Sequence, residues 1–193
     1  MSNTVITEER KYWLPDQELS LTDLDLKGRI LDIGGGGEGI IGRIFPERVV
    51  AIDPIKRELE ETPEGPLKII MDGKDLKFLD NSFETVTSLF TLMFIKCEDH
   101  EQVLREAYRV LKPNGELHIW DIEIPEYDGG EKDLILFKFK YHIPQGTDNS
   151  GYGTRWPGRI QNIHYFRALA EKAGFKPAAE EMKDNIIYLK LIK

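Results

Sequence analysis

Residues 30–42 read ILDIGGGGEGIIG, an apolar run followed by a glycine-rich stretch and a second apolar run. The first run is largely β-branched and suits a central β-strand. Four consecutive glycines, Gly34–Gly37, suit neither a strand nor a helix, but they allow backbone N–H groups to approach a ligand closely because no Cβ atom intervenes. A helix that begins after them would direct its first amides at a carboxylate or phosphate. The stretch therefore predicts a ligand-binding loop between a strand and a helix.

Two adenosine-containing ligands fit this loop. Gly34, Gly36 and Gly39 satisfy the pattern G-x-G-x-x-G, which is typical of NAD sites. Asp32 stands two residues before the first glycine, near the expected carboxyl end of the strand, where a carboxylate is a poor neighbour for a pyrophosphate and a good one for an ammonium. S-adenosylmethionine carries an ammonium, a carboxylate and a sulfonium in place of the pyrophosphate, so Asp32 favours it over NAD.

Three segments resemble the class I S-adenosylmethionine-dependent methyltransferases. Residues 32–36 are similar to the first motif of that family, acid-x-Gly-x-Gly-x-Gly, although Glu38 stands where the third glycine falls. Residues 75–86, DLKFLDNSFETV, and residues 109–117, RVLKPNGEL, are similar to two further family elements, with Lys77 and Glu84 as departures from the usual proline and aspartate. The resemblance runs from about residue 28 to residue 193 and leaves out residues 122–160.

The cofactor site that the resemblance implies lies at the ends of successive strands. Asp53 closes the apolar run 49–52, and a carboxylate there can accept hydrogen bonds from ribose hydroxyls in either an NAD or an S-adenosylmethionine site; its alternative role is to cap a helix near residues 56–61. Asp72 is placed to accept from the adenine amino group, or else is a surface turn residue. The expected cofactor-binding residues are Asp32, Gly34, Gly35, Gly36, Asp53, Pro54, Asp72, Gly73, Leu89 and Phe90.

The expected fold class is α/β, a three-layer Rossmann-like sandwich with a mostly parallel seven-stranded sheet and a C-terminal antiparallel hairpin. Apolar runs predict strands at 30–33, 49–52, 67–71, 85–90 and 116–120, and the hairpin at 175–182 and 186–192. Apolar faces at helical spacing predict helices at 98–112 and 160–173, the second ending at Gly174. A chain of 193 residues suits one domain spanning 1–193.

Two segments are not part of the predicted sandwich of strands and helices. Residues 1–28 are expected to form a half-buried helix or an extended cap, in which Tyr12 and Trp13 either cover the cofactor or simply pack. Residues 122–160 are expected to form an insertion with an added strand at 134–143 and a long loop at 144–159, interpreted as a lid that binds the methyl acceptor.

Methyl transfer needs alignment of the acceptor above all, and a base only when the acceptor is a hydroxyl or a protonated amine. The candidates for such a base are His142, His164, Tyr141 and Tyr152, together with His100, which is expected to be solvated. Met93 and Phe94 cannot move a proton. The sequence shows no metal-ligand spacing and no serine nucleophile motif. The alternatives to a methyltransferase are an NAD(P)-dependent oxidoreductase and a catalytically silent S-adenosylmethionine-binding module.

Composition limits the partners. A net charge of −8 disfavours nucleic acid, and the single cysteine, Cys97, cannot form an internal disulfide, as is typical of a reducing compartment. The N-terminal residues are polar, unlike a signal peptide, and no apolar run has the length of a membrane span. We therefore expect a cytoplasmic monomer or homodimer that acts on a small molecule, with no nucleic-acid partner, no membrane partner and no metal.

Overall fold

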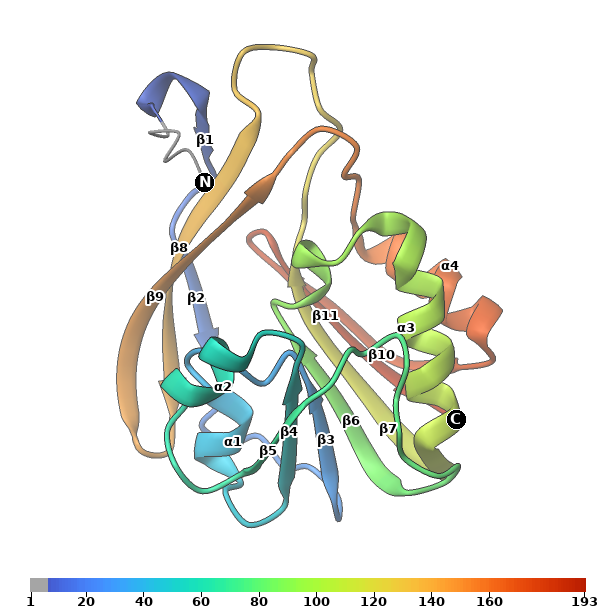
Figure 1. Cartoon of the computed structure of the whole chain (residues 1–193). Coiled ribbons are helices and arrows are strands. Elements are labelled where there is room, and N and C mark those ends of the chain that lie inside the picture. Colours follow the sequence, from blue (N-terminus) through green and yellow to red (C-terminus); the bar gives the residue numbers. More distant parts are fainter. Residues whose placement is uncertain (1–6) are drawn as a thin grey trace.

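The computed structural model describes residues 7–193, and its centre is a seven-stranded sheet with the order β10-β11-β7-β6-β3-β4-β5 (Figure 1). The strands are β3 (Ile30–Ile33), β4 (Val49–Asp53), β5 (Leu67–Ile70), β6 (Phe83–Leu89), β7 (Leu111–Ile122), β10 (Lys176–Lys183) and β11 (Ile186–Ile192). The first five run parallel, and β10 and β11 form the C-terminal antiparallel hairpin beside β7. The predicted fold class and hairpin are confirmed.

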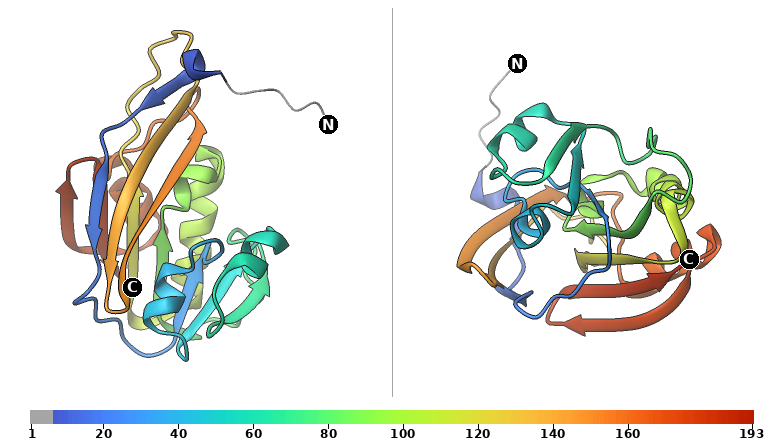
Figure 2. Two further views of the ribbon diagram at one scale, coloured as in Figure 1. Left: turned by 90° about the vertical axis from the view of Figure 1, so that its left-hand side faces the viewer. Right: turned by 90° about the horizontal axis from the view of Figure 1, so that it is seen from below.

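Two long helices, α3 (Cys97–Val110) and α4 (Ile163–Ala173), cover one face of this sheet (Figures 1 and 2). The first turn of α3 is acidic and its last turn carries Arg109, as the helix dipole favours. The Asn162 side chain caps α4 by accepting from the Tyr165 N–H at 2.9 Å, and Gly174 ends the helix with a left-handed backbone at φ 109°. The predicted helix 98–112 ends early, because Leu111 already pairs with β6.

A second sheet covers much of the other face, beside the short helices α1 (Ile40–Ile44) and α2 (Lys56–Glu61). It contains β1 (Lys11–Trp13), β2 (Gln17–Ser20), β8 (Leu134–Ile143) and β9 (Gly146–Arg155). Strand β8 lies parallel to β1 and β2 on one side and antiparallel to β9 on the other. One outer layer of the sandwich is therefore largely a sheet, which the sequence patterns did not predict.

This second sheet corrects one prediction and decides between two alternatives for another. Residues 144–159 are not a long loop, because most of them form β9. The N-terminal cap is extended, not helical, apart from the 3-10 turn η1 (Glu8–Arg10), and residues 1–6 of the predicted cap lie outside the described residues. Tyr12 packs on Trp156, with ring centroids 4.6 Å apart, and neither Tyr12 nor Trp13 covers the cavity described below.

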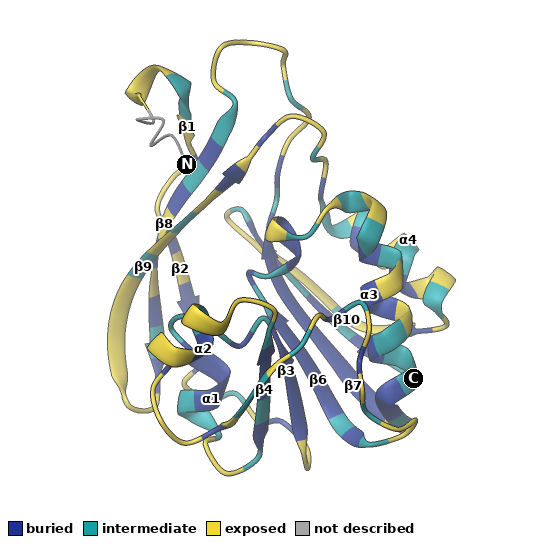
Figure 3. Ribbon diagram, viewed as in Figure 1, coloured by how far each residue is buried: buried dark blue, intermediate teal, exposed yellow. Residues whose placement is uncertain are grey.

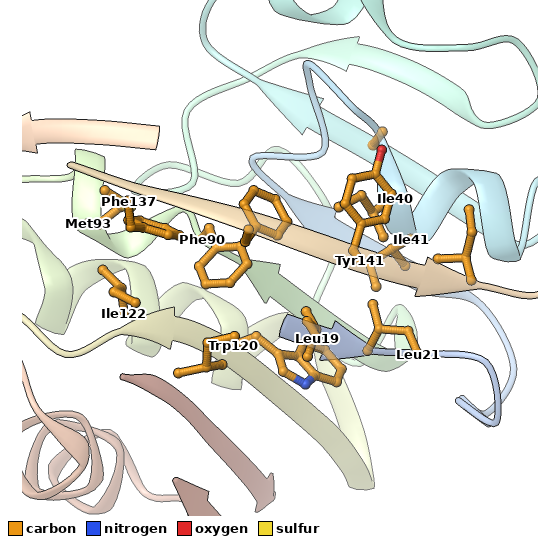
Figure 4. Close-up of a cluster of buried hydrophobic side chains, with 14 of the residues drawn as sticks. Leu19, Leu21, Ile40, Ile41, Phe90, Met93, Trp120, Ile122, Phe137 and Tyr141 are labelled. Carbon is orange, nitrogen blue, oxygen red and sulfur yellow. The ribbon is translucent and has the colours of Figure 1, made fainter. Parts of the chain in front are cut away.

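The space between the two sheets is filled by large apolar side chains (Figure 4). The ribbons of β6 and β7 are buried along most of their length (Figure 3). Alternate residues of β8, among them Phe137 and Tyr141, point inward, while Lys138 and Lys140 point to solvent. They meet side chains from α1, β2, β7 and the residue after β6, including Ile41, Leu19, Trp120 and Phe90 (Figure 4). The N-terminal segment and the insertion thus share one core with the main sheet.

A buried carboxylate, Glu116, joins β7 to its neighbours at the end of the sheet opposite the glycine loop. It accepts from Lys27 Nζ at 2.5 Å and lies 3.1 Å from Lys190 Nζ and 3.2 Å from His118 Nε2. Burial alone would raise the pKa of Glu116, but these three donors outweigh it and lower the pKa to about 2. The ionised form of Glu116 therefore stabilises the folded state.

We predict that Glu116→Gln lowers the free energy of unfolding at pH 7 by about 1–3 kcal/mol, the scale of a lost hydrogen bond to a charged group. The folded pKa lies below the unfolded one, so the stabilisation is complete above the ordinary glutamate value of 4.5 and is lost as pH falls toward 2. Urea unfolding at pH 7, 4 and 3 measures the difference in the free energy of unfolding between the wild type and Glu116→Gln. Glu181→Gln, an exposed change on β10, is the control. Equal stability of Glu116→Gln and wild type at pH 7 would contradict the prediction.

Candidate functional site

A cavity of about 590 Å³ opens at the carboxyl ends of β3, β4 and β6. Ligand sites of open α/β sheets lie at this edge. Its walls come from the glycine loop, the β4–α2 connection, the turn after β5, the segment after β6, the start of α3 and Tyr152 of β9. Of the expected cofactor residues, the cavity is lined by Gly34, Gly36, Asp53, Pro54, Asp72, Gly73, Leu89 and Phe90.

The glycine loop is held tightly against β4. The N–H groups of Gly34 and Gly35 both donate to the Ile52 carbonyl, at 2.8 and 3.0 Å. Gly34 has a left-handed backbone with φ 74°, and a Cβ atom there would lie 2.3 Å from the Thr91 side chain. Glycine at this position therefore lets the loop and the end of β6 approach each other, and both line the cavity. Helix α1, which follows, has five residues, so its dipole adds little to the site.

Asp32 and Gly35 lie behind the loop and do not line the cavity. The Asp32 carboxylate is 3% exposed and accepts from Thr87 Oγ1 at 2.6 Å; a Cβ atom on Gly35 would lie 2.7 Å from it. Burial raises the pKa of Asp32 to about 7, although the bond from Thr87 opposes this shift. Asp32 therefore supports the loop from inside the sheet, and its carboxylate is not part of the cavity wall.

Asp53 and Asp72 face the cavity from two adjacent strand ends. Asp53 Oδ1 accepts from the Ile55 N–H at 2.7 Å, and the residue before α2 is Ile55, so Asp53 is not the cap of that helix. Its other oxygen lies beside Gly36, where a Cβ atom would come within 3.0 Å of it. Burial raises the pKa of Asp53, and the negative charge of Glu58 adds to the shift. Asp72 accepts from the Lys74 N–H at 2.9 Å and stays half-exposed.

The end of β6 forms the wall beside the loop. Phe90 has a left-handed backbone, φ 49°, which is rare for a bulky residue and marks local strain. Its N–H donates to the Trp120 carbonyl at 2.7 Å. Its ring packs on Phe139 and Tyr152 of the second sheet, with centroids 4.9 and 5.8 Å away. Phe90 therefore belongs both to the cavity wall and to the core between the sheets.

Of the residues considered as bases, only Tyr152 lines the cavity. Its hydroxyl donates to Glu38 of the glycine loop. Burial, together with the negative charge of Glu38, raises the pKa of Tyr152 far above its ordinary value, so the hydroxyl keeps its proton at neutral pH. The Tyr141 hydroxyl lies 2.8 Å from Arg43 Nη1 and does not reach the cavity.

The histidines are placed elsewhere. His142 points to the outer side of β8, where its ring lies 2.8 Å from Thr147 Oγ1 and 2.7 Å from Glu18 Oε1, and His164 is exposed near the start of α4. His100 was expected to be solvated but is buried, and its ring nitrogens lie 2.9 Å from the Tyr165 hydroxyl and the Leu92 carbonyl. Burial lowers the pKa of His100, so it is neutral and fixes the 3-10 turn η2 (Leu92–Phe94).

Several cavity residues were not predicted as site residues. Glu38 and Thr91 line the cavity together with Glu58, Phe94 and Asp99. The signal for Glu38 was its place in the glycine loop, where the family motif has glycine; the others come together only through the fold. Met93, by contrast, is fully buried core. Across residues 7–193 we find no group of three or more His, Cys, Asp or Glu side chains arranged to hold a metal, and no helix with the length and apolarity of a membrane span.

Comparison with known proteins finds methyltransferases. Residues 31–119 match the family described as "Methyltransferase domain". The demethylmenaquinone methyltransferase of Listeria welshimeri is 35% identical over 111 residues, which are 56% of this chain and 45% of that protein. A ubiquinone/menaquinone biosynthesis C-methyltransferase of Desulfotalea psychrophila is 33% identical over 162 residues, which are 75% of this chain and 63% of the relative. The chain thus spans about half to two thirds of the length of these relatives.

Solved structures show the same fold. An S-adenosylmethionine-dependent methyltransferase from Mesorhizobium loti has a TM-score of 0.63 at 16% identity, covering 89% of this chain and 94% of that one. The protein PH0226 from Pyrococcus horikoshii has a TM-score of 0.64 at 17% identity, covering 89% and 85%. Residues 31–119 are therefore similar in sequence to the methyltransferase domain family, and the sheet order and these solved structures show that the chain has the fold of the S-adenosylmethionine-dependent methyltransferases.

Proposed function

We propose that this protein transfers a methyl group from S-adenosylmethionine to a small-molecule acceptor. The observation that carries the proposal is the wall of the cavity, where bare glycine backbone, Asp53, Asp72 and the end of β6 meet at one edge of the sheet. Asp53 would accept from the ribose hydroxyls and Asp72 from the adenine amino group. The loop at Gly34 and Gly36 and the backbone at Leu89–Phe90 would hold the methionine part.

The charge of the cavity favours this cofactor over NAD. Five carboxylates line it, against two lysines and no arginine. Lys74 is already bound to Asp99 at 2.9 Å, and Lys96 lies 3.6 Å from Glu98. A diphosphate would be repelled by the negative potential of the cavity, because both lysines are already paired with carboxylates. A cofactor with a net positive charge is attracted by the same potential.

The chemistry requires little of the protein beyond binding and alignment. S-adenosylmethionine supplies an activated methyl group whose leaving group departs as a neutral thioether. The side chains of this chain orient the acceptor and exclude water, and alignment of this kind can lower a barrier by several kcal/mol. We propose that residues 122–160 form the acceptor side, since Tyr152 of β9 reaches the cavity. A cytoplasmic location is also proposed, in keeping with the single cysteine.

We predict that Asp53→Ala weakens binding of S-adenosylhomocysteine, measured by titration calorimetry, by about 1–3 kcal/mol, because the ribose loses a charged acceptor. Asp75→Ala is the matched control, since Asp75 is an acid in a nearby turn that lies outside the cavity and binds Lys77. NAD is expected to give no heat of binding. Unchanged S-adenosylhomocysteine affinity in a folded Asp53→Ala protein would show that Asp53 does not bind the cofactor. Binding of NAD without binding of S-adenosylhomocysteine would favour NAD as the cofactor.

We also predict that Tyr152 is not a general base. Tyr152→Phe should keep the methyl-transfer rate within about tenfold, because removal of a true base costs about 10²–10⁴-fold. Tyr152→Ala should be more damaging, because the ring packs on Phe90, Phe94 and Phe139. The assay follows gain of one methyl mass in metabolite extracts supplied with labelled cofactor. A methyl-transfer rate at least a hundredfold lower in Tyr152→Phe would indicate that Tyr152 is a general base after all. Cofactor binding with no methyl transfer to a component of any extract would indicate a catalytically silent module.

A further inference from the structure

Glu38 is a half-buried carboxylate whose bound partners are all neutral. It extends from the glycine loop into the cavity and accepts from the hydroxyls of Ser150 and Tyr152, one on each oxygen. Over residues 7–193 the structure pairs no lysine, arginine or histidine with it, and the nearby Arg43 binds Tyr141 and Asp148 instead. A carboxylate oxygen can accept more than one hydrogen bond, so both oxygens can still receive a donor from a ligand.

The other cavity carboxylates have partners or assigned roles. Asp53 and Asp72 stand at the adenosine end, Asp99 binds Lys74 at 2.9 Å, and Glu58 lies 3.2 Å from Arg57. Glu38 is thus the cavity carboxylate that neither faces a protein cation nor serves the adenosine. Withdrawing a carboxylate from water without a cation costs free energy, which binding of a cationic group at Glu38 would recover.

Aromatic rings surround the same position. The Tyr152 ring lies 5.8 Å from the ring of Phe90 and 5.9 Å from that of Phe94, and all three residues line the cavity with Glu38. Phe94 is 50% exposed, so this part of the wall is open to an entering molecule. Aromatic faces attract cations, and aromatic side chains beside a carboxylate are a typical arrangement for binding an ammonium group.

We propose that the methyl acceptor is an amine, and that Glu38, held by Ser150 and Tyr152 and flanked by Phe90 and Phe94, binds its nitrogen. This inference rests on the proposed function, since it concerns the acceptor of the same reaction. Glu38 binds the ammonium form on entry, and the amine loses one proton to water before it reacts. Methylation then forms a bond from nitrogen to the methyl carbon and breaks the carbon–sulfur bond, whose electron pair stays on sulfur.

The direction of charge movement explains why a carboxylate suits an amine. During the transfer the positive charge leaves sulfur and appears on nitrogen, beside Glu38, which stabilises the developing cation. A phenol or a quinol would have to react through an oxygen-bound anion, and Glu38 together with the other cavity carboxylates would raise the free energy of that anion. The acidic wall therefore distinguishes between these two acceptor classes.

Benzylamine and benzyl alcohol test this inference, because they share a ring and differ in charge. We expect the protein saturated with S-adenosylhomocysteine to bind benzylamine at least about tenfold more tightly than benzyl alcohol, as titration calorimetry would show. Glu38→Gln should reduce the ratio to below about twofold, with S-adenosylhomocysteine affinity unchanged. Glu58→Gln is the matched control, since it removes the same charge from the same cavity at a carboxylate that already pairs with Arg57 at 3.2 Å, and it should keep the preference.

The outcomes separate the two proposals. If S-adenosylhomocysteine fails to bind the wild-type protein, the proposed function fails. If it binds and benzylamine shows no preference, only the amine assignment fails. A drop in cofactor affinity in Glu38→Gln with the amine preference intact would place the cofactor's own ammonium at Glu38 and overturn the inference. Methyl transfer to hydroquinone but to none of a panel of aliphatic and aromatic amines, followed by mass, would also overturn it.

Discussion

The site depends on the way in which the chain leaves β6 at Phe90. Its left-handed backbone ends the strand while its N–H still donates to the Trp120 carbonyl of β7, and its ring turns into the core between the two sheets. There it meets Phe137 and Phe139 of β8, at centroid distances of 5.4 and 4.9 Å. Phe90 thus belongs both to the wall of the cavity and to the contact with the second sheet, so strain in its backbone is offset by burial of its ring.

Covering the main sheet with a second sheet has consequences that a helical layer would not have. Side chains of a strand alternate between two faces, so β8 places Phe137, Phe139 and Tyr141 in the core and leaves His142 outside. The hairpin then carries Ser150 and Tyr152 of β9 across to Glu38 of the glycine loop. Since β8 also pairs with β1 and β2, the N-terminal segment borders this hairpin along the edge of β8 that β9 leaves free.

The parallel strands of the main sheet could be predicted because each contains a short run of apolar or β-branched residues, and because the glycine loop is a local signal. Strand β9 could not, because its residues GTDNSGYGTR have neither apolar alternation nor high strand propensity, and they are held by pairing with β8. Asp32 and Asp53 both end strands, yet only Asp53 lines the cavity. That difference depends on the side of the sheet and on Gly35, which sequence position alone does not reveal. His100 was misjudged because its neighbours in the sequence are acidic, although it stands at helical spacing from Val103, Leu104 and Ala107 on the buried face of α3.

The negative charge of Glu38 acts on both the glycine-loop side and the β9 side of the cavity. Glycine in the loop brings backbone close to the ligand, and an acid at Glu38, where the family motif has a third glycine, adds a negative group that the loop itself does not need. That carboxylate would be costly beside a diphosphate or a phenolate and is favourable beside a sulfonium or an ammonium. Because Ser150 and Tyr152 hold it from a sheet that is itself placed by Phe90, the same aromatic core that shapes the cavity also fixes the position of its unpaired charge. Selection of the cofactor and selection of the acceptor then follow from one electrostatic property of the cavity wall.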